Sequence, residues 1–358
     1  MLAFYHIFLL FLSSYVIWKV CDSFQLASIF IGKNMPNGTR GATINAIGSS
    51  IPEFLTSLIA IFKYSDVNGA LFGIANTTGS VIYNITIIPF FVIISCYIFK
   101  NVERINFNKR ILFRDGIFLI FTQIALTKIL ETGVFTYISS FCLVFIYIIY
   151  LFILFKFSIG EKQFEQSNTK LQHSKSLLVN ILNINLFSLL FPHKKEITKF
   201  NSVVILTLCI TLFYFMCHIL VSSSYALGDI LHIPSYIVAI TLTAIATSVP
   251  DTILSVKDAK INEFDESITN VFGSNIFNIS FCIGAPMLLY NIVYSTDIFL
   301  GEDSVSDINH FKYLSIIYIV ISMILLSTKT KKYWKTKALF FVILYAIFLY
   351  LLIMKIQP

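Results

Sequence analysis

Long apolar stretches alternate with short polar segments along this whole sequence. A run of roughly 20 apolar residues is long enough to cross a bilayer as an α-helix. The pattern therefore predicts an all-α membrane protein with ten transmembrane helices. The predicted helices cover residues 3–20, 42–62, 70–99, 115–131, 134–156, 201–221, 235–256, 267–292, 312–327 and 337–354.

A more polar stretch separates the first five apolar segments from the last five. We expect residues 1–156 to form one five-helix repeat, 157–200 a cytoplasmic loop, and 201–358 a second five-helix repeat. Because five is an odd number, the two repeats would be inverted relative to each other in the membrane. Within the loop, the apolar stretch 177–191 predicts an amphipathic helix lying on the membrane surface.

Composition agrees with a membrane class, since 57% of residues are hydrophobic, 13% are charged and the mean hydropathy is +0.81. The first apolar segment also has the length of a signal peptide. It lacks a basic start, and no small-residue cleavage site follows it, so we expect it to remain as a helix of the mature protein.

The net charge of +7 predicts membrane topology rather than a nucleic-acid partner. With the N-terminus outside, basic residues gather in the segments that face inward. Of the 26 lysines and arginines, only Lys63, Lys128, Lys312 and Lys355 then fall near the other side. The positive-inside rule thus predicts a multi-pass protein of the plasma or inner membrane, with both termini outside and the central loop in the cytoplasm.

Two motifs in the first half return in the second half. Residues 48–53 read GSSIPE and residues 246–251 read ATSVPD, so each copy places one carboxylate directly after a proline. Residues 79–84 read GSVIYN and residues 273–278 read GSNIFN. An ionisable group at membrane depth usually marks an ion or substrate path. Acids in matching places of two repeats, Glu53 and Asp251, indicate one shared site at the repeat interface.

Helical spacing places oxygen-bearing side chains beside each carboxylate. Proline also removes a backbone donor and frees the carbonyl four residues earlier. A serine or asparagine alone is more often an interhelical hydrogen-bonding group, and for Asn76 and Asn270 packing is as good an interpretation as coordination. Glycines 79 and 273 predict close helix crossing. The predicted stripes are Ala46, Ser49, Ser50, Glu53 and Ser57; Ala244, Thr247, Ser248, Asp251 and Ser255; Asn76, Ser80 and Asn84; and Asn270, Ser274 and Asn278.

Carboxylate, amide, hydroxyl and carbonyl oxygens together are the ligands of a hard cation. Ca²⁺ takes 6–8 oxygens in irregular geometry, and two carboxylates neutralise it. Several Na⁺ ions would neutralise the same pair. The six cysteines and six histidines are scattered, without metal-ligand spacing, and no nucleotide or hydrolase motif occurs. The sequence thus predicts neither an enzyme nor a resident cofactor.

We expect the remaining acids to lie at helix ends or in loops, where their side chains are solvated. They are Asp66, Asp115, Glu131, Asp229, Asp258, Glu263, Asp265 and Glu266.

At the four motifs the chain resembles the cation/calcium exchanger superfamily, and within it the sodium/calcium exchanger branch. The resemblance is strong over 41–90 and 240–290 and extends loosely to the whole chain. It implies ten helices whose repeats meet at the membrane centre. It also implies that Glu53 and Asp251 hold Ca²⁺, with Ser49 and Thr247 beside them. Flanking Na⁺ sites would use Ser50, Ser80, Ser248, Ser274 and the carbonyls of Ala46 and Ala244, with Asn84 and Asn278 completing the middle.

These features predict a monomeric antiporter that exchanges Na⁺ for Ca²⁺ by alternating access. Potassium-dependent relatives have aspartate where Asn278 stands, so we expect K⁺-independence. Proton/calcium relatives use a Gly-Asn-x-x-Glu core that neither repeat shows. Proton-coupled antiport of a divalent cation is the nearest alternative, and a cation channel lined by the same acids is a more distant one.

Overall fold

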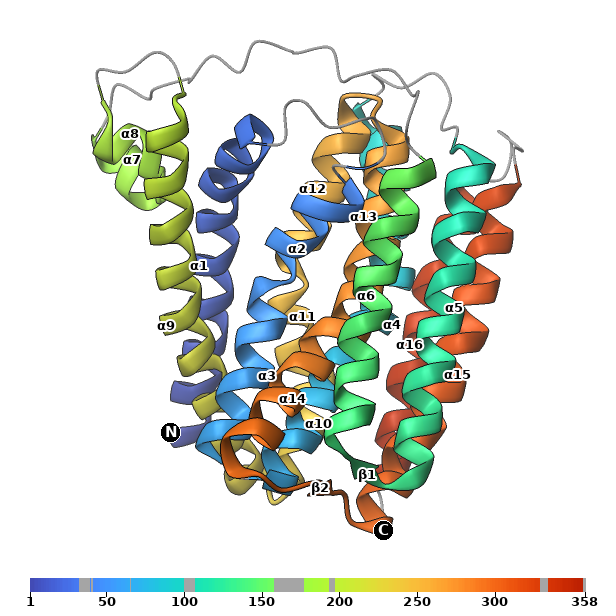
Figure 1. The fold of residues 1–358 in the computed structure, drawn as a ribbon. Coiled ribbons are helices and arrows are strands. Elements are labelled where there is room, and N and C mark those ends of the chain that lie inside the picture. The colour runs from blue at the N-terminus through green and yellow to red at the C-terminus, as the bar shows by residue number, and fades with distance from the viewer. Residues whose placement is uncertain are drawn as a thin grey trace.

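The structure is a computed structural model that describes residues 1–31, 39, 41–64, 66–99, 107–157, 177–192, 197–328 and 334–356. It is a bundle of long helices that lie side by side, with one short β-ribbon (Figure 1). The first-half elements are α1 Leu2–Ile31, η1 Gly41–Asn45, α2 Ala46–Ser49, α3 Ile51–Lys63, α4 Asp66–Phe99, α5 Lys109–Thr132, β1 Val134–Phe135, α6 Tyr137–Phe157, α7 Leu177–Leu182 and α8 Leu186–Leu190. The second-half elements are α9 Lys199–Leu231, α10 Ser235–Val238, η2 Ala239–Thr243, α11 Ala244–Thr247, α12 Val249–Lys260, α13 Phe264–Phe277, η3 Asn278–Cys282, α14 Ile283–Tyr294, β2 Ile298–Phe299, α15 Glu302–Ser327 and α16 Trp334–Ile356.

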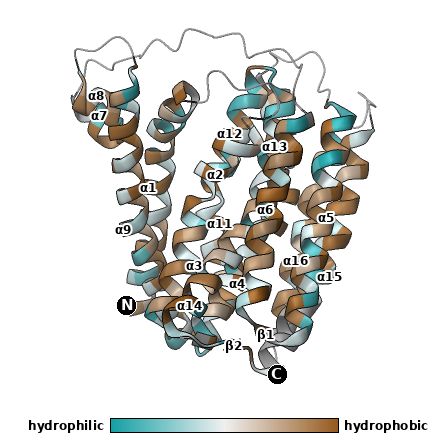
Figure 2. Cartoon of the chain, in the orientation of Figure 1, coloured by the Kyte–Doolittle hydropathy of each residue, from teal (hydrophilic) through white to brown (hydrophobic). Residues whose placement is uncertain are grey.

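The helices have the apolar length that a bilayer demands. Within the described residues, seven helices are long and apolar enough to cross a membrane, or eight if the bent pair Gly41–Ser49 and Ile51–Lys63 counts as one. The predicted segment 115–131 lies in α5, which carries charges at both ends, and 312–327 lies in the shorter apolar stretch Phe311–Ser327. Apolar residues dominate the flanks of the bundle, and polar ones gather toward its ends (Figure 2). The chain is therefore a mostly helical, multi-pass membrane protein.

Two flanking groups of helices enclose the centre. Helices α1 and α9 pack along each other on one flank, whereas α5, α15 and α16 form the other (Figure 1). Between them lie the broken helices α2–α3 and α11–α12, together with α4, α13, α14 and α6. Both chain ends lie at one end of the bundle, where β1 pairs antiparallel with β2. The short helices α7 and α8 lie at the opposite end.

The apolar stretch 177–191 is helical as predicted, but it forms two short helices held against α1. Tyr15 donates from its hydroxyl to the Leu182 carbonyl at 3.1 Å, and Lys19 Nζ donates to Asn183 Oδ1 at 2.9 Å. The backbone N–H of Leu186 donates to Ser23 Oγ at 3.0 Å. These bonds join the described part of the central loop to the first helix. Most of the predicted loop, including residues 158–176 and 193–196, lies outside the described residues.

Each proline motif breaks its helix. Ser50, between α2 and α3, has φ −95° and ψ 6°, and Ser248, between α11 and α12, has φ −83° and ψ 0°. The next helix then begins with proline in its first turn, where the missing N–H costs nothing. The first break bends the segment by 44°. A π-helical turn, η1 or η2, precedes each break, and such turns often occur at functional sites.

Each unbroken motif helix crosses the broken helix of the other half at a glycine. A Cβ added at Gly79 on α4 would lie 2.1 Å from the Ile240 carbonyl oxygen, and one added at Gly273 on α13 would lie 2.8 Å from the Ala42 Cα. The two predicted close crossings are therefore confirmed. They place the Asn and Ser side chains of α4 and α13 beside the two breaks.

We expect Gly79→Ala to destabilise the protein by about 1–3 kcal/mol, because the added methyl group collides with backbone rather than with a flexible side chain. The measurement is the apparent melting temperature of the purified protein in detergent. Gly228→Ala is the control, since its Cβ would lie 3.0 Å from the nearest atom and requires only a small adjustment. Equal melting temperatures for Gly79→Ala and wild type would contradict this close crossing.

Candidate functional site

Two carboxylates lie at the centre of the bundle, one from each broken helix. Glu53 is in the first turn of α3 and Asp251 in the first turn of α12, and both are fully buried, at 0% exposure. The carboxylates are close enough to repel each other electrostatically. The breaks determine this placement, because a helix that restarts in mid-membrane presents unpaired N–H groups and a positive dipole end to an acid in its first turn.

Glu53 is only half satisfied by the protein. Ser248 Oγ donates to its Oε1 at 3.3 Å. The other oxygen, Oε2, is buried and has no hydrogen-bond partner. A buried carboxylate oxygen without a partner is costly, and bound cations are one of the few groups that relieve the cost.

Asp251 has a fuller set of donors. Ser274 Oγ donates to Oδ1 at 2.7 Å, and Asn84 Nδ2 donates to Oδ2 at 2.9 Å. Each acid thus accepts a hydrogen bond from the other half of the chain, Glu53 from Ser248 and Asp251 from Asn84. This reciprocal arrangement is the geometry that the matching sequence motifs predict.

The predicted flanking oxygens lie around the two breaks. Ser80 Oγ is 3.4 Å from both the Ala244 carbonyl oxygen and Thr247 Oγ1. The Ala46 carbonyl accepts from the backbone N–H of Ser50 at 3.2 Å. Ser50 itself is fully buried, and its hydroxyl has no partner. All twelve predicted ligand residues are buried, so none is lost to the lipid-facing surface.

The four predicted amides differ in their surroundings. Asn84 bonds Asp251 directly, whereas Asn278 Oδ1 accepts only from the Cys282 thiol, at 3.5 Å, and its Nδ2 has no partner. Asn270 donates to the Asp251 carbonyl at 3.2 Å and to Ser255 Oγ at 3.0 Å. Both polar atoms of Asn76 are buried and unpartnered. Asn270 therefore braces the helix that carries Asp251, while its counterpart makes no such bond.

One residue of the site was not predicted. Asn275 is fully buried on α13, where its Oδ1 accepts from Asn84 Nδ2 at 3.0 Å and its Nδ2 donates to the Val81 carbonyl at 3.3 Å. The sequence contains a signal for it: at the matching position of the first repeat stands Val81, so an amide replaces an apolar residue in the middle of the motif. Because the two repeats differ at this position, Asn275 is not among the residues that they share.

The donor set suits a hard cation. Several buried oxygens around the site have no hydrogen-bond partner, among them Glu53 Oε2, Asn84 Oδ1 and Ser50 Oγ. In the part of the chain that the structure describes, no three His, Cys, Asp or Glu side chains gather as a metal cluster, so the chemistry depends on amide, hydroxyl and carbonyl oxygens around two acids. Such oxygens bind Na⁺ and Ca²⁺ and are poor ligands for zinc or copper.

The expectation of solvated acids outside the motifs is wrong at three positions. Asp115, Asp258 and Glu266 are each at most 2% exposed. Helix ends pack against one another there and supply partners: Asn45 Nδ2 lies 3.3 Å from Asp258 Oδ2, and the Gly41 N–H donates to Glu266. Asp229 is exposed as predicted.

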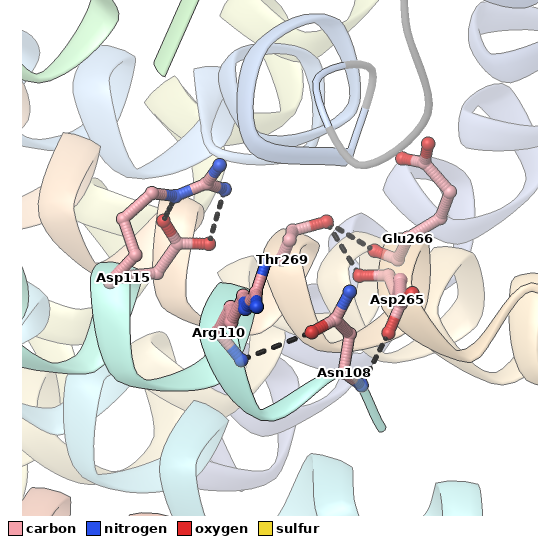
Figure 3. A network of polar contacts seen from close by, with 7 residues as sticks. Asn108, Arg110, Asp115, Asp265, Glu266 and Thr269 are labelled. Carbon is pink, nitrogen blue, oxygen red and sulfur yellow. Dashed lines mark hydrogen bonds and ion pairs between the residues drawn. The ribbon is translucent and has the colours of Figure 1, made fainter. Parts of the chain in front are cut away.

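Figure 3 shows the surroundings of two of these acids, where α5 and α13 begin. Arg114 holds Asp115 through two hydrogen bonds, of 2.7 and 3.1 Å, and the Asn108 N–H donates to Asp265 Oδ1 at 2.8 Å. Acids paired in this way serve packing, and they are separate from the central pair.

Comparison with known proteins gives a consistent result. The family model described as sodium/calcium exchanger protein matches residues 5–156 and 175–354. An uncharacterized membrane protein of Methanocaldococcus jannaschii is 26% identical over 277 residues, which cover 77% of each chain. Sodium/potassium/calcium exchanger 2 of Mus musculus is 30% identical over 134 residues, which are 37% of this chain and 20% of the mouse protein.

Two solved structures have a similar fold. A structure of the sodium-calcium exchanger NCX_Mj has a TM-score of 0.62 at 21% identity and covers 96% of this chain and 98% of its own. The H⁺/Ca²⁺ exchanger CAX has a TM-score of 0.63 at 14% identity and covers 97% of this chain and 86% of its own. At these identities the likeness establishes the fold alone.

We expect Ca²⁺ to raise the apparent melting temperature of the protein, because a ligand that binds only the folded state stabilises it by mass action. In Asp251→Asn the increase should disappear, since one of two charges that neutralise the cation is gone. The control is Asp229→Asn, which removes an exposed acid at the end of α9 and should keep the full increase. An undiminished increase in Asp251→Asn would place the cation elsewhere.

Proposed function

Starting from the fact that the chain belongs to the sodium/calcium exchanger protein family, we propose that it is an antiporter that exchanges Na⁺ for Ca²⁺ across a membrane. The observation that carries the proposal is the pair Glu53 and Asp251, fully buried and surrounded by oxygens, several of which lack hydrogen-bond partners. In this proposal the transported ions are the only ligands, and the protein needs no cofactor and catalyses no covalent reaction.

We further propose that ten segments cross the membrane as two inverted five-helix repeats. The first repeat spans residues 1–156, the second spans 201–358, and a cytoplasmic loop at 157–200 joins them. The bond that each acid accepts from the other half, Ser248 to Glu53 and Asn84 to Asp251, and the paired crossings at Gly79 and Gly273 support this symmetry. Each repeat supplies half of the site, so neither half would bind the cation alone.

Orientation follows from charge. The excess of lysine and arginine on one set of loops supports a cytoplasmic central loop, with both termini outside, in a plasma or inner membrane. The described ends of the chain lie at one end of the bundle and α7–α8 at the other, which is compatible with this topology (Figure 1). We propose a monomer in the lipid bilayer as the working unit, because both carboxylates belong to one chain.

The buried charges also suggest why transport would be an exchange. Moving an unpaired carboxylate through a low-dielectric layer costs several kcal/mol per charge. The empty site would carry two such charges, so the protein could reorient only after a cation had neutralised them. One Ca²⁺ or several Na⁺ ions would meet that condition. An inward Na⁺ gradient would then drive Ca²⁺ outward by alternating access.

The choice of coupling ion rests on Asn278. It is a buried neutral amide one helical turn after Ser274, which donates to Asp251, so only two negative charges would need to be neutralised and no further K⁺ would be required. The fold shared with the H⁺/Ca²⁺ exchanger CAX favours proton-coupled divalent antiport as the second candidate, since protons also neutralise carboxylates. A channel with the same acids would need no counter-ion at all.

We expect vesicles loaded with Na⁺ and containing the purified protein to take up radiolabelled Ca²⁺ when diluted into Na⁺-free medium. Uptake should vanish without internal Na⁺ and should not respond to K⁺. Flux that follows a pH gradient in the absence of Na⁺ would support the proton-coupled alternative. Ca²⁺ conductance without any counter-ion would support a channel.

Glu53→Gln should abolish this uptake, because a single carboxylate leaves a Ca²⁺ complex with net positive charge that cannot cross the apolar barrier. The matched control is Glu131→Gln, which removes a helix-end acid that pairs with Lys128 and should retain exchange. Normal exchange by Glu53→Gln would remove this residue from the transport site.

Asn278→Asp should make Ca²⁺ exchange depend on K⁺, because a third buried carboxylate requires one more monovalent cation for neutrality. The measurement is Ca²⁺ uptake at fixed Na⁺ with and without K⁺. Uptake by Asn278→Asp that is as fast as wild type and insensitive to K⁺ would contradict the charge-neutrality argument.

A further inference from the structure

We propose that Asn275 is a positioning residue that determines which atom of Asn84 faces the transported cation. The inference rests on the proposed exchange function and adds a residue outside the set of predicted ligands. Its basis is a chain of three hydrogen bonds. The chain runs from the backbone of α4 through Asn275 on α13 to Asn84 on α4, and from Asn84 to Asp251.

The chain begins at a group that cannot change its role. The Val81 carbonyl oxygen only accepts hydrogen bonds, so the Asn275 group 3.3 Å from it must be the Nδ2 donor. This fixes the orientation of the Asn275 amide. Its Oδ1 then faces Asn84, and an oxygen in that position accepts only from Nδ2 of Asn84, at 3.0 Å.

Both hydrogens of Asn84 Nδ2 are consequently committed. One goes to Asn275 Oδ1 and the other to Asp251 Oδ2, at 2.9 Å. The remaining polar atom, Asn84 Oδ1, is fully buried and has no partner. It is therefore available to a cation held by the acid pair. A flipped amide would present N–H hydrogens instead and would repel the ion.

Asp251 alone would not maintain this orientation through a transport cycle. When a cation binds Asp251 it competes with Asn84 for the carboxylate, and the bond from Nδ2 weakens when the oxygen ligand is needed. The hydrogen bond that Asn84 Nδ2 donates to Asn275 Oδ1 does not involve the cation. It therefore keeps Asn84 in the same orientation in the loaded and empty states.

The equivalent amide of the second repeat, Asn278, has no such orienting partner on α4. The counterpart of Asn275 is Val81, whose side chain has no hydrogen-bonding atom, and the counterpart of Asn84 is Asn278. The Nδ2 of Asn278 is buried without a partner. Asn275 thus makes the two repeats unequal, with a fixed amide from α4 and an amide of freer orientation from the second repeat.

The test is a double-mutant cycle on the Ca²⁺ concentration for half-maximal Na⁺-dependent uptake. Asn275→Leu, which preserves volume and removes the amide, should raise this concentration roughly tenfold. In an Asn84→Ala background residue 84 has no amide left to orient, and the number of buried charges is unchanged. There, adding Asn275→Leu should change the half-maximal concentration less than twofold.

Thr86→Val is the control, because Thr86 is buried on α4 and its hydroxyl donates only within its own helix, to the Ile82 carbonyl at 2.5 Å and the Tyr83 carbonyl at 3.4 Å. It should leave the half-maximal concentration within twofold of wild type. If Asn275→Leu does not reach the membrane, Asn275→Ala replaces it in the same cycle.

The outcomes separate the two proposals. Wild-type protein that shows no Na⁺-dependent Ca²⁺ uptake would overturn the exchange function. With wild-type exchange intact, an unchanged half-maximal concentration in Asn275→Leu would overturn the positioning role alone. So would an equal increase in both backgrounds, which would indicate that Asn275 supports only the packing of α13 against α4.

Discussion

Electrostatic repulsion between two carboxylates inside an apolar bundle is the constraint on which the rest of the structure depends. Glu53 and Asp251 are both removed from solvent, and each would raise the energy of the other if charged and uncompensated. The protein compensates in part, through helix N-termini and through hydroxyl and amide donors. It leaves one carboxylate oxygen without a donor, and we attribute the remaining compensation to transported cations.

The broken helices are the structural means of meeting this constraint. A continuous helix would satisfy its own backbone and offer nothing to an acid at its middle. By restarting at Ile51 and Val249, α3 and α12 place the positive ends of two helices at the bundle centre. The glycine crossings then bring α4 and α13 close enough for their Asn and Ser side chains to reach the acids.

The two halves of the site are related but not equal. Asp251 has the shorter side chain and donors on both oxygens, so it is fixed. Glu53 has a longer side chain and an unpartnered Oε2. We interpret Asp251 as the rigid member of the pair and Glu53 as the adaptable one. Such a division would let one site accept either a single divalent ion or several monovalent ions.

Because the motif is duplicated, the sequence alone indicates which residues are buried around the two acids. Recurrence of a proline followed by an acid identified Glu53 and Asp251, and helical spacing identified the residues buried around them. The same reasoning failed where the repeats differ or where tertiary packing decides. Asn275 is not predicted because its counterpart in the first repeat is Val81. Asp115 is expected to be solvated but is buried, because local sequence does not reveal which helix ends pack together. The pairing of α7–α8 with α1 depends on contacts between distant segments and has no local signal either.

The most direct test of the central claim is the position of a bound divalent cation. Crystals of the protein soaked with Sr²⁺ as an electron-dense substitute for Ca²⁺ would reveal it by anomalous scattering. We expect one dominant peak within about 2.3–2.8 Å of oxygens from both Glu53 and Asp251, slightly longer than the Ca²⁺ range because Sr²⁺ is larger. A dominant peak bound to neither acid, in protein that still transports Ca²⁺, would contradict it.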